Sequence, residues 1–221
     1  MYGGAKFIRS VGVELEGGIR ESAISYLRSE FGPRVVVGYD GSVKVPGDSE
    51  DWRYDAEIRF WSESLDELLR FVRSAFDLGL TQNASCGNHH HFVFGYHSLI
   101  VSAMATPRLY RDFMREYGKF MKGLPDELRP KYERRIDNRY CAFPSKENMR
   151  YAILGLERYY SVNFAAMYKH GTLEVRLPPH VEDYDEFARV HLWLVKTMDS
   201  LAGKYLRGAR MHSTYALTVD E

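Results

Sequence analysis

The chain has 221 residues, 45% of them hydrophobic, which is enough for one core of ordinary size. Its 30 basic and 30 acidic residues give a formal net charge of +0, which favours neither a nucleic-acid partner nor an anionic membrane surface. No apolar run approaches the roughly 20 residues that cross a bilayer, and the first residues lack a signal-peptide pattern. We therefore expect a cytoplasmic protein. Two cysteines, Cys86 and Cys141, are too few for a disulfide framework, so we expect reduced thiols, with a single disulfide between them as the alternative.

The first half of the chain alternates between strand and helix patterns. Apolar residues recur at every second position in the expected strands and at spacings of three and four in the expected helices. A Ser64-to-Glu67 capping box opens one helix, Gly79 ends it, and Asp40-Gly41 is a hairpin turn. The patterns predict strands over 6–16, 35–37, 42–45 and 52–61, and helices over 20–31 and 64–79.

The second half begins with the run Cys86-Gly87-Asn88-His89-His90-His91, a turn that enters a strand ending at Phe94. Residues 97–157 then read as a mainly helical excursion. Two short strands and a long amphipathic helix follow, and the tail beyond Arg210 is expected to fray. The patterns predict helices over 97–122, 124–135, 147–157 and 183–205, and strands over 159–164 and 172–177.

Four strands carry ionisable groups on one face and apolar groups on the other. Because amphipathic helices must cover an apolar sheet face, we predict an α+β fold with one curved antiparallel sheet of about six strands and helices on one side. One domain would span 1–221. The ionisable groups would converge on the open face: Glu14 and Glu16; Asp55, Glu57 and Arg59; His89 and His91; Glu174 and Arg176.

The carboxylates in this set indicate a cation site. Like charges side by side repel by about 1 kcal/mol at 4 Å in water, so Arg59, Arg176 and bound cations should compensate. Oxygen-rich ligands favour Mg²⁺ or Mn²⁺, and such ions beside an arginine suit phosphoryl chemistry. A three-histidine zinc site is the competing idea, but alternation sends His90 behind the sheet or to its edge. Ordinary solvent-facing side chains are the third interpretation.

Several motifs together resemble one family. Gly12-Val13-Glu14-Leu15-Glu16, Cys86-Gly87-Asn88-His89-His90-His91 and Gly171-Thr172-Leu173-Glu174-Val175-Arg176 are its most specific pieces here, joined by shorter ones between residues 10 and 180. They occur in the order seen in the amidoligase family of carboxylate–amine ligases, whose catalytic sheet is shared with glutamine synthetase and glutamate–cysteine ligase. The resemblance implies ATP-dependent amide bond formation through an acyl phosphate, with ATP and Mg²⁺ or Mn²⁺ as cofactors and a carboxylate and an amine as substrates.

The resemblance also implies residue roles. Arg176, Glu174 and Arg139 would be catalytic, with Arg139 on the carboxylate substrate; His89 would contact the nucleotide, and Asp40, Ser42 and Asn163 would line the substrate side. Arg59, which the family pattern lacks, is expected to contact the nucleotide because of its positive charge beside Glu57. The implied metal ligands are Glu14, Glu16, Glu57, His89, His91 and Glu174. The chain departs from the family pattern at Arg59-Phe60-Trp61, at His90 and at Pro178-Pro179. A phosphotransferase or hydrolase using the same carboxylates, or a non-catalytic binding protein on this fold, remains an alternative.

Overall fold

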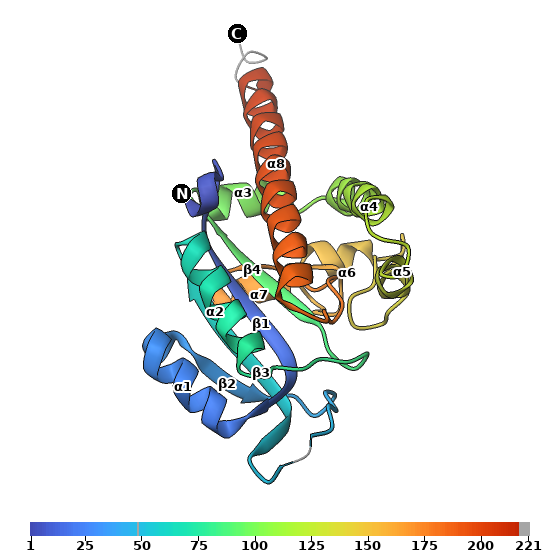
Figure 1. Ribbon diagram of the computed structural model, residues 1–221. Helices are drawn as coiled ribbons and strands as arrows, with labels where there is room; N and C mark the ends of the chain where they lie inside the picture. Colours follow the sequence, from blue (N-terminus) through green and yellow to red (C-terminus); the bar gives the residue numbers. More distant parts are fainter. Residues whose placement is uncertain (48, 217–221) are drawn as a thin grey trace.

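The computed structural model describes residues 1–47 and 49–216. Within them, six antiparallel strands form one sheet in the order β2-β3-β1-β4-β6-β5 (Figure 1). The strands are β1 (Ile8–Arg20), β2 (Val36–Tyr39), β3 (Trp52–Ser62), β4 (Asn88–Phe94), β5 (Val162–Asn163) and β6 (Leu173–Val175). The predicted α+β class and the six-stranded antiparallel sheet are confirmed.

Eight α-helices accompany the sheet in the described part of the chain. They are α1 (Glu21–Phe31), α2 (Leu65–Asp77), α3 (His97–Met104), α4 (Pro107–Lys122), α5 (Arg129–Ile136), α6 (Met149–Ile153), α7 (Ala165–His170) and α8 (Tyr184–Ala216). Helices α3 to α6 form the expected helical excursion. Helix α8 is longer than predicted, and the expected fraying concerns a tail whose residues 217–221 lie outside the described part. Among the helices that the structure describes, none combines the length and apolarity of a membrane span.

The core lies on one face of the sheet. Strand β1 supplies Val11, Val13 and Leu15, and β3 supplies Ile58 and Phe60, all buried. Helices α1, α2 and α8 lie over this face (Figure 1). The predicted stripe of α8 is buried along its length, and these side chains belong to one cluster with the strand residues: Phe187, Val190, Leu194, Met198, Leu201 and Tyr205. Burial of this face holds the opposite, polar face in place.

The central strand continues past the Gly17-Gly18 pair that was expected to end it. The register against β3 shifts between Gly17 and Ile19, and pairing resumes at Ile19. A Cβ on Gly17 would lie 2.6 Å from the carbonyl oxygen of Thr81, and one on Gly18 would lie 2.5 Å from the Trp52 ring. The glycines therefore serve the close approach of neighbouring segments.

Other predictions were wrong in detail because local patterns do not report tertiary pairing. Residues 42–45 form no strand; the turn at Asp40 forms, but only Val45 bonds across, to Tyr54. Tyr54 is in phase with the buried Ala56 and Ile58 of β3, but it is half exposed under the Lys44 ammonium. The helix expected over 147–157 shortens to α6, and the strands expected over 159–164 and 172–177 shorten to β5 and β6. The turn expected between those strands is the helix α7.

Candidate functional site

The register of the sheet arranges the polar face in rows. Glu16 of β1 pairs with Glu57 of β3. In the next row, Glu14 of β1 stands between Arg59 of β3 and His89 of β4. Residues directly opposite on neighbouring strands have Cβ atoms about 5 Å apart, so these side chains meet. A third row follows one pair further along: Trp61, Gly12, His91, Glu174 and Asn163.

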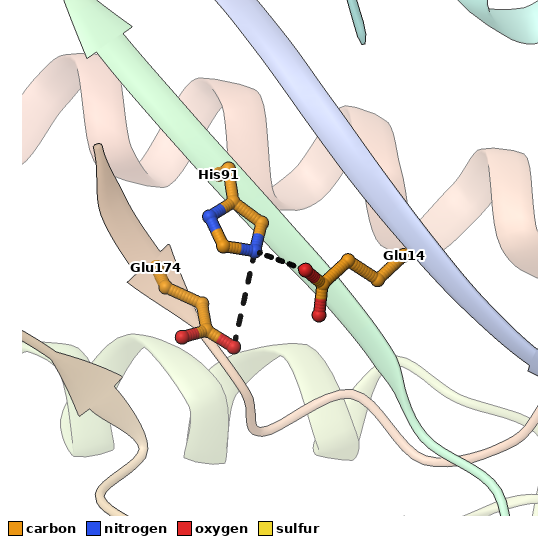
Figure 2. Close-up of side chains that lie close together, drawn as sticks. All are labelled: Glu14, His91 and Glu174. Carbon is orange, nitrogen blue, oxygen red and sulfur yellow. Dashed lines mark ion pairs between the residues drawn. The ribbon is translucent and has the colours of Figure 1, made fainter. Parts of the chain in front are cut away.

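A first group of possible metal ligands joins Glu14, His91 and Glu174 (Figure 2), whose ligand atoms lie within 4.8 Å of one another. His91 Nε2 lies 3.2 Å from Glu14 Oε1 and 3.9 Å from Glu174 Oε1. That nitrogen is buried and has no hydrogen-bond partner among the described residues. The other ring nitrogen lies 2.8 Å from the Thr172 hydroxyl, which orients the ring as outer partners of metal-bound histidines do.

A second group joins Glu16, Asp40 and Glu57, again within 4.8 Å. Glu16 is buried and accepts a 2.6 Å hydrogen bond from the Gly87 backbone N–H. The Asp40 carboxylate accepts from the Ser42 N–H at 2.8 Å and from its hydroxyl at 2.6 Å, so Asp40 is both a turn residue and a member of the cluster. Three carboxylates without a nitrogen suit a hard cation such as Mg²⁺.

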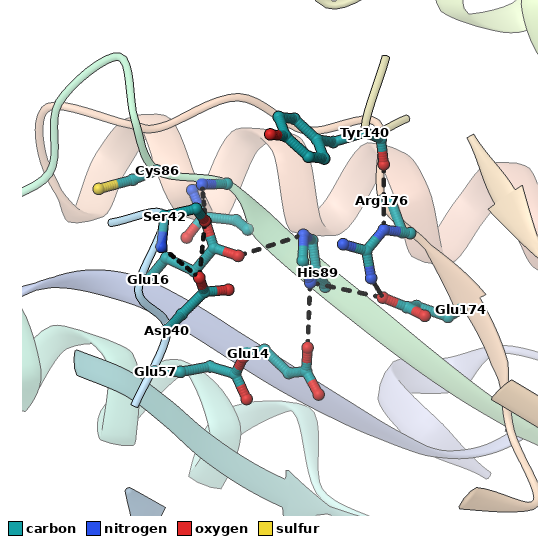
Figure 3. Close-up of polar contacts among 12 residues, drawn as sticks. Glu14, Glu16, Asp40, Ser42, Glu57, Cys86, His89, Tyr140, Glu174 and Arg176 are labelled. Carbon is teal, nitrogen blue, oxygen red and sulfur yellow. Dashed lines mark hydrogen bonds and ion pairs between the residues drawn. The ribbon is translucent and has the colours of Figure 1, made fainter. Parts of the chain in front are cut away.

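His89 lies between the two groups (Figure 3). Its Nδ1 is 3.0 Å from Glu14 Oε2 and 3.4 Å from Glu174 Oε1, and its Nε2 is 3.6 Å from Glu16 Oε1. It belongs to neither three-residue group. A ring at this point can ligate a cation or, when protonated, pair with the carboxylates on both sides.

Two arginines flank the cluster. Arg176 donates to Glu174 Oε1 at 2.7 Å and to the Tyr140 carbonyl oxygen at 3.2 Å. Arg59 pairs with Glu57 and lies 3.9 Å from Glu14. The predicted convergence of carboxylates, histidines and arginines on one face is therefore present in the structure.

Burial and charge shift the protonation equilibria of this cluster. Burial opposes ionisation of Glu14, but the hydrogen bond with His89 and the closeness of His91 outweigh it and hold the pKa of Glu14 well below its usual range. Burial lowers the pKa of His91, but Glu14 and Glu174 outweigh burial, so the pKa is raised above its usual value. Burial raises the pKa of Glu16, with Asp40 adding to the effect and His89 opposing it. Glu16 therefore holds its negative charge less easily than Glu14.

Three connected clefts cross this face. A central cleft of about 380 Å³ is lined by residues of both groups, among them Glu14, Glu57 and Glu174, and by His89. The Trp61 cleft, of about 500 Å³, is mainly apolar and is lined by Gly12, Pro33, Arg34, Val36 and Trp61. The arginine cleft, of about 420 Å³, is lined by Arg135, Arg158, Arg176, Tyr140 and Tyr159. Arg59 borders the Trp61 cleft and the central cleft, and Arg176 borders the central cleft and the arginine cleft.

Sequence reasoning did not find two residues of the arginine cleft, Arg135 and Arg158. Arg135 donates to the carbonyl oxygens of Arg176 and Leu177, and Arg158 donates to the Tyr159 hydroxyl. Within residues 1–47 and 49–216, neither guanidinium forms an ion pair with a carboxylate, which leaves both able to bind an anion. No local pattern marks them, because Arg135 lies near the end of α5 and Arg158 follows α6, and only the fold brings these segments to the sheet.

The remaining expected residues occupy different places. Arg139 is exposed outside the three clefts, with its guanidinium 4.7 Å from the Tyr140 ring centroid, so the structure does not bring it to the cluster. Ser42 lines the arginine cleft. The Asn163 amide donates to Glu174 Oε2 at 2.5 Å and its oxygen accepts from the Ala165 N–H, so it positions a cluster carboxylate. Cys86 and Cys141 are both free and buried, as expected for reduced thiols.

His90 packs behind the sheet, as alternation predicts. It is fully buried against Phe187 and His191, with ring centroids 5.5 and 5.1 Å away, and neither ring nitrogen has a partner among the described residues. Burial, reinforced by His191, holds the pKa of His90 well below its usual value. A three-histidine zinc site is therefore not formed.

Comparison with known proteins yields no match: no family model, no curated protein and no solved structure is similar to this chain. The chemistry of the site must be argued from its own residues.

Proposed function

We propose that the protein is an ATP-dependent carboxylate–amine ligase that uses Mg²⁺ or Mn²⁺. The observation that supports this most is the placement of two acidic groups on either side of His89, with Arg59 and Arg176 at their flanks. Hydrolytic zinc sites are built mainly from nitrogen or sulfur ligands, whereas paired oxygen-rich sites beside arginines suit nucleotide phosphates. The order of motifs that resembles the amidoligase family agrees with this chemistry.

The donor sets fit divalent ions. Glu14, His91 and Glu174 would hold one, and Glu16, Asp40 and Glu57 a second. The buried His91 Nε2 forms no hydrogen bond and lies beside two carboxylates, an arrangement that a bound cation would explain. Ions bound there would neutralise negative charge on the triphosphate. Asn163 and Thr172 keep Glu174 and His91 in position for this role.

Amide bond formation by this route has two steps. A carboxylate oxygen of the first substrate bonds to the γ-phosphorus of ATP while the bond to the β-phosphate oxygen breaks, which releases ADP and leaves an acyl phosphate. An amine then bonds to the acyl carbon, the carbon–oxygen bond to phosphate breaks, and the proton of the amine passes to the departing phosphate. Arg176, at the border of the central and arginine clefts, would stabilise the negative charge on the transferred phosphoryl group.

The test is release of ADP and phosphate from Mg²⁺-ATP with pooled amino acids as carboxylates and amines. We expect release to require both. Arg176→Ala should lose about 100- to 1000-fold in turnover with the thermal unfolding profile kept, the usual size for a lost transition-state contact. Arg9→Ala, an exposed arginine paired with Glu63, is the matched control and should retain activity.

Other results would replace the proposal. Phosphate release without an amine would indicate a hydrolase or phosphotransferase. Absence of metal and nucleotide binding by calorimetry would indicate a non-catalytic binding protein. An unfolded Arg176→Ala variant would show that this residue is structural, and Glu174→Gln, which keeps the side-chain shape, would then be the deciding variant.

A further inference from the structure

The Trp61 cleft presents apolar surface beside the charged cluster. Trp61 continues the polar face of β3, in phase with Glu57 and Arg59, yet it is 53% exposed. Val36 of β2, opposite Arg59, is 48% exposed and lines the same cleft. Gly12 stands opposite Trp61 on β1 and leaves the floor of the cleft open. A large aromatic side chain kept in solvent next to a polar site is characteristic of a ligand surface.

The wall beside Trp61 is held rigidly. Arg34 forms two hydrogen bonds with the Glu67 carboxylate, of 2.8 and 2.6 Å, which fix its plane. The guanidinium lies 5.0 Å from the Phe60 ring centroid and 6.0 Å from that of Trp61. Because Glu67 already neutralises Arg34, the part of the cleft around Trp61 and Val36 is mainly apolar, and Arg34 there offers a carboxylate little attraction.

The arginine cleft, at the other end of the polar face, is positively charged and not apolar. In the arginine cleft, Arg135 and Arg158 have no carboxylate partner within the described residues. A carboxylate substrate is therefore best bound there, and the apolar end is left for an uncharged, planar group. Trp61 and Glu57 are four residues apart, about 13 Å along a strand, so a ligand on Trp61 can extend past Arg59 to the second acidic group.

We propose that the Trp61 cleft binds the base of the nucleoside triphosphate, stacked on the Trp61 ring, with its phosphates extending past Arg59 into the central cleft. This inference rests on the proposed function and assigns the two substrates to opposite ends of the polar face. The nucleotide binds at the Trp61 cleft, and the carboxylate binds at the arginine cleft. Base–aromatic stacking tolerates any base, so the cleft recognises a purine by its shape and its flat face.

The experiment compares two ligands by calorimetry in the presence of Mg²⁺: ATP, and inorganic triphosphate, which has the phosphates without the base. Trp61→Ala should weaken ATP binding about 5- to 150-fold, the range for loss of one stacked base, and leave triphosphate binding unchanged. Trp61→Phe, which keeps an aromatic face, should recover most of the ATP affinity. Tyr26→Ala removes an aromatic side chain of nearly equal exposure, 52%, on α1 and should bind ATP like the unmodified protein.

The outcomes separate this inference from the proposed function. If ATP binds no more tightly than triphosphate, or Trp61→Ala weakens both ligands equally, the base does not lie on Trp61, although the phosphate chemistry stands. If Trp61→Ala weakens a carboxylate substrate and spares ATP, the cleft belongs to the acid. If neither phosphate ligand binds, both proposals are overturned.

Discussion

Replacing Glu16 by glutamine should stabilise the metal-free protein and weaken its response to metal. Glu16 is buried, and its carboxylate lies within 4.8 Å of Asp40 and Glu57. Glutamine keeps the size of the side chain and an oxygen for the hydrogen bond from the Gly87 N–H. The substitution therefore removes one negative charge from a group of three while changing little else.

The size of the effect follows from Coulomb's law. At 4.8 Å, two carboxylates repel by about 0.9 kcal/mol in water and by about 3.5 kcal/mol at an effective dielectric constant of 20. Glu16→Gln removes two such pairs but also the attraction to His89 Nε2, 3.6 Å away. A net gain of about 1 to 2 kcal/mol is expected, which raises the Tm of a chain of this size by about 2 to 8 °C.

The assay is thermal unfolding with and without Mn²⁺. The unmodified protein should gain about 2.7 kcal/mol at a metal concentration of 100 times Kd, and the variant much less. Glu63→Gln, an exposed glutamate paired with Arg9, should shift like the unmodified protein. A variant that is less stable without metal, and that gains as much from Mn²⁺ as the unmodified protein, would refute the reasoning that these carboxylates form a cation site.

Three further predictions test other parts of the structure. Arg158→Ala should raise the KM for the carboxylate substrate by about tenfold or more, while Arg139→Ala should not. Steady-state kinetics of the two variants tests this. A larger rise of KM in Arg139→Ala would show that Arg139 binds the carboxylate. His90→Phe should keep or raise the Tm because it removes two unpartnered buried nitrogens, whereas His91→Phe should lose the Mn²⁺-induced shift; equal responses to metal would contradict the assigned faces. Burial lowers the pKa of His191 to about 3, so below about pH 6.5 the unfolded chain binds a proton at His191 that the folded state does not. The free energy of unfolding should therefore fall by roughly 1.4 kcal/mol per pH unit from about pH 6.5 toward pH 3. Denaturant titrations at several pH values should show this fall, and a less steep one in His191→Gln.

Alternation along the strands predicted the side of the sheet on which each polar residue lies. Glu14, Glu16, His89, His91 and Glu174 share one face because side chains on a strand alternate with a period of two. The same alternation places Trp61 in phase with Glu57 and Arg59. The sequence therefore contains a signal for the apolar cleft, an aromatic residue in phase with the charged residues of the same strand.

What the sequence could not supply is the register. Whether Glu14 faces His89 or a residue two positions away depends on pairing between segments about 75 residues apart, which local patterns do not encode. The register also decides that the turn at Asp40, which lines the arginine cleft, brings the Asp40 carboxylate against Glu16 and Glu57. Arg135 and Arg158 reach the site from outside the sheet, so neither strand periodicity nor motif spacing could identify them.

The two faces of the sheet are energetically dependent on each other. Five acidic residues gather on the polar face, Glu14, Glu16, Asp40, Glu57 and Glu174, and each close pair of carboxylates costs stability when no cation is bound. The apolar face offsets that cost through side chains such as Val13, Ile58 and Phe92, which alternate with the acidic and histidine residues on the same strands. A substitution that weakens the core should therefore be compensated by metal, and one that neutralises the cluster should tolerate core defects better. If the cluster is a cation site, Phe92→Leu and Glu16→Gln together should be more stable without metal than Phe92→Leu alone.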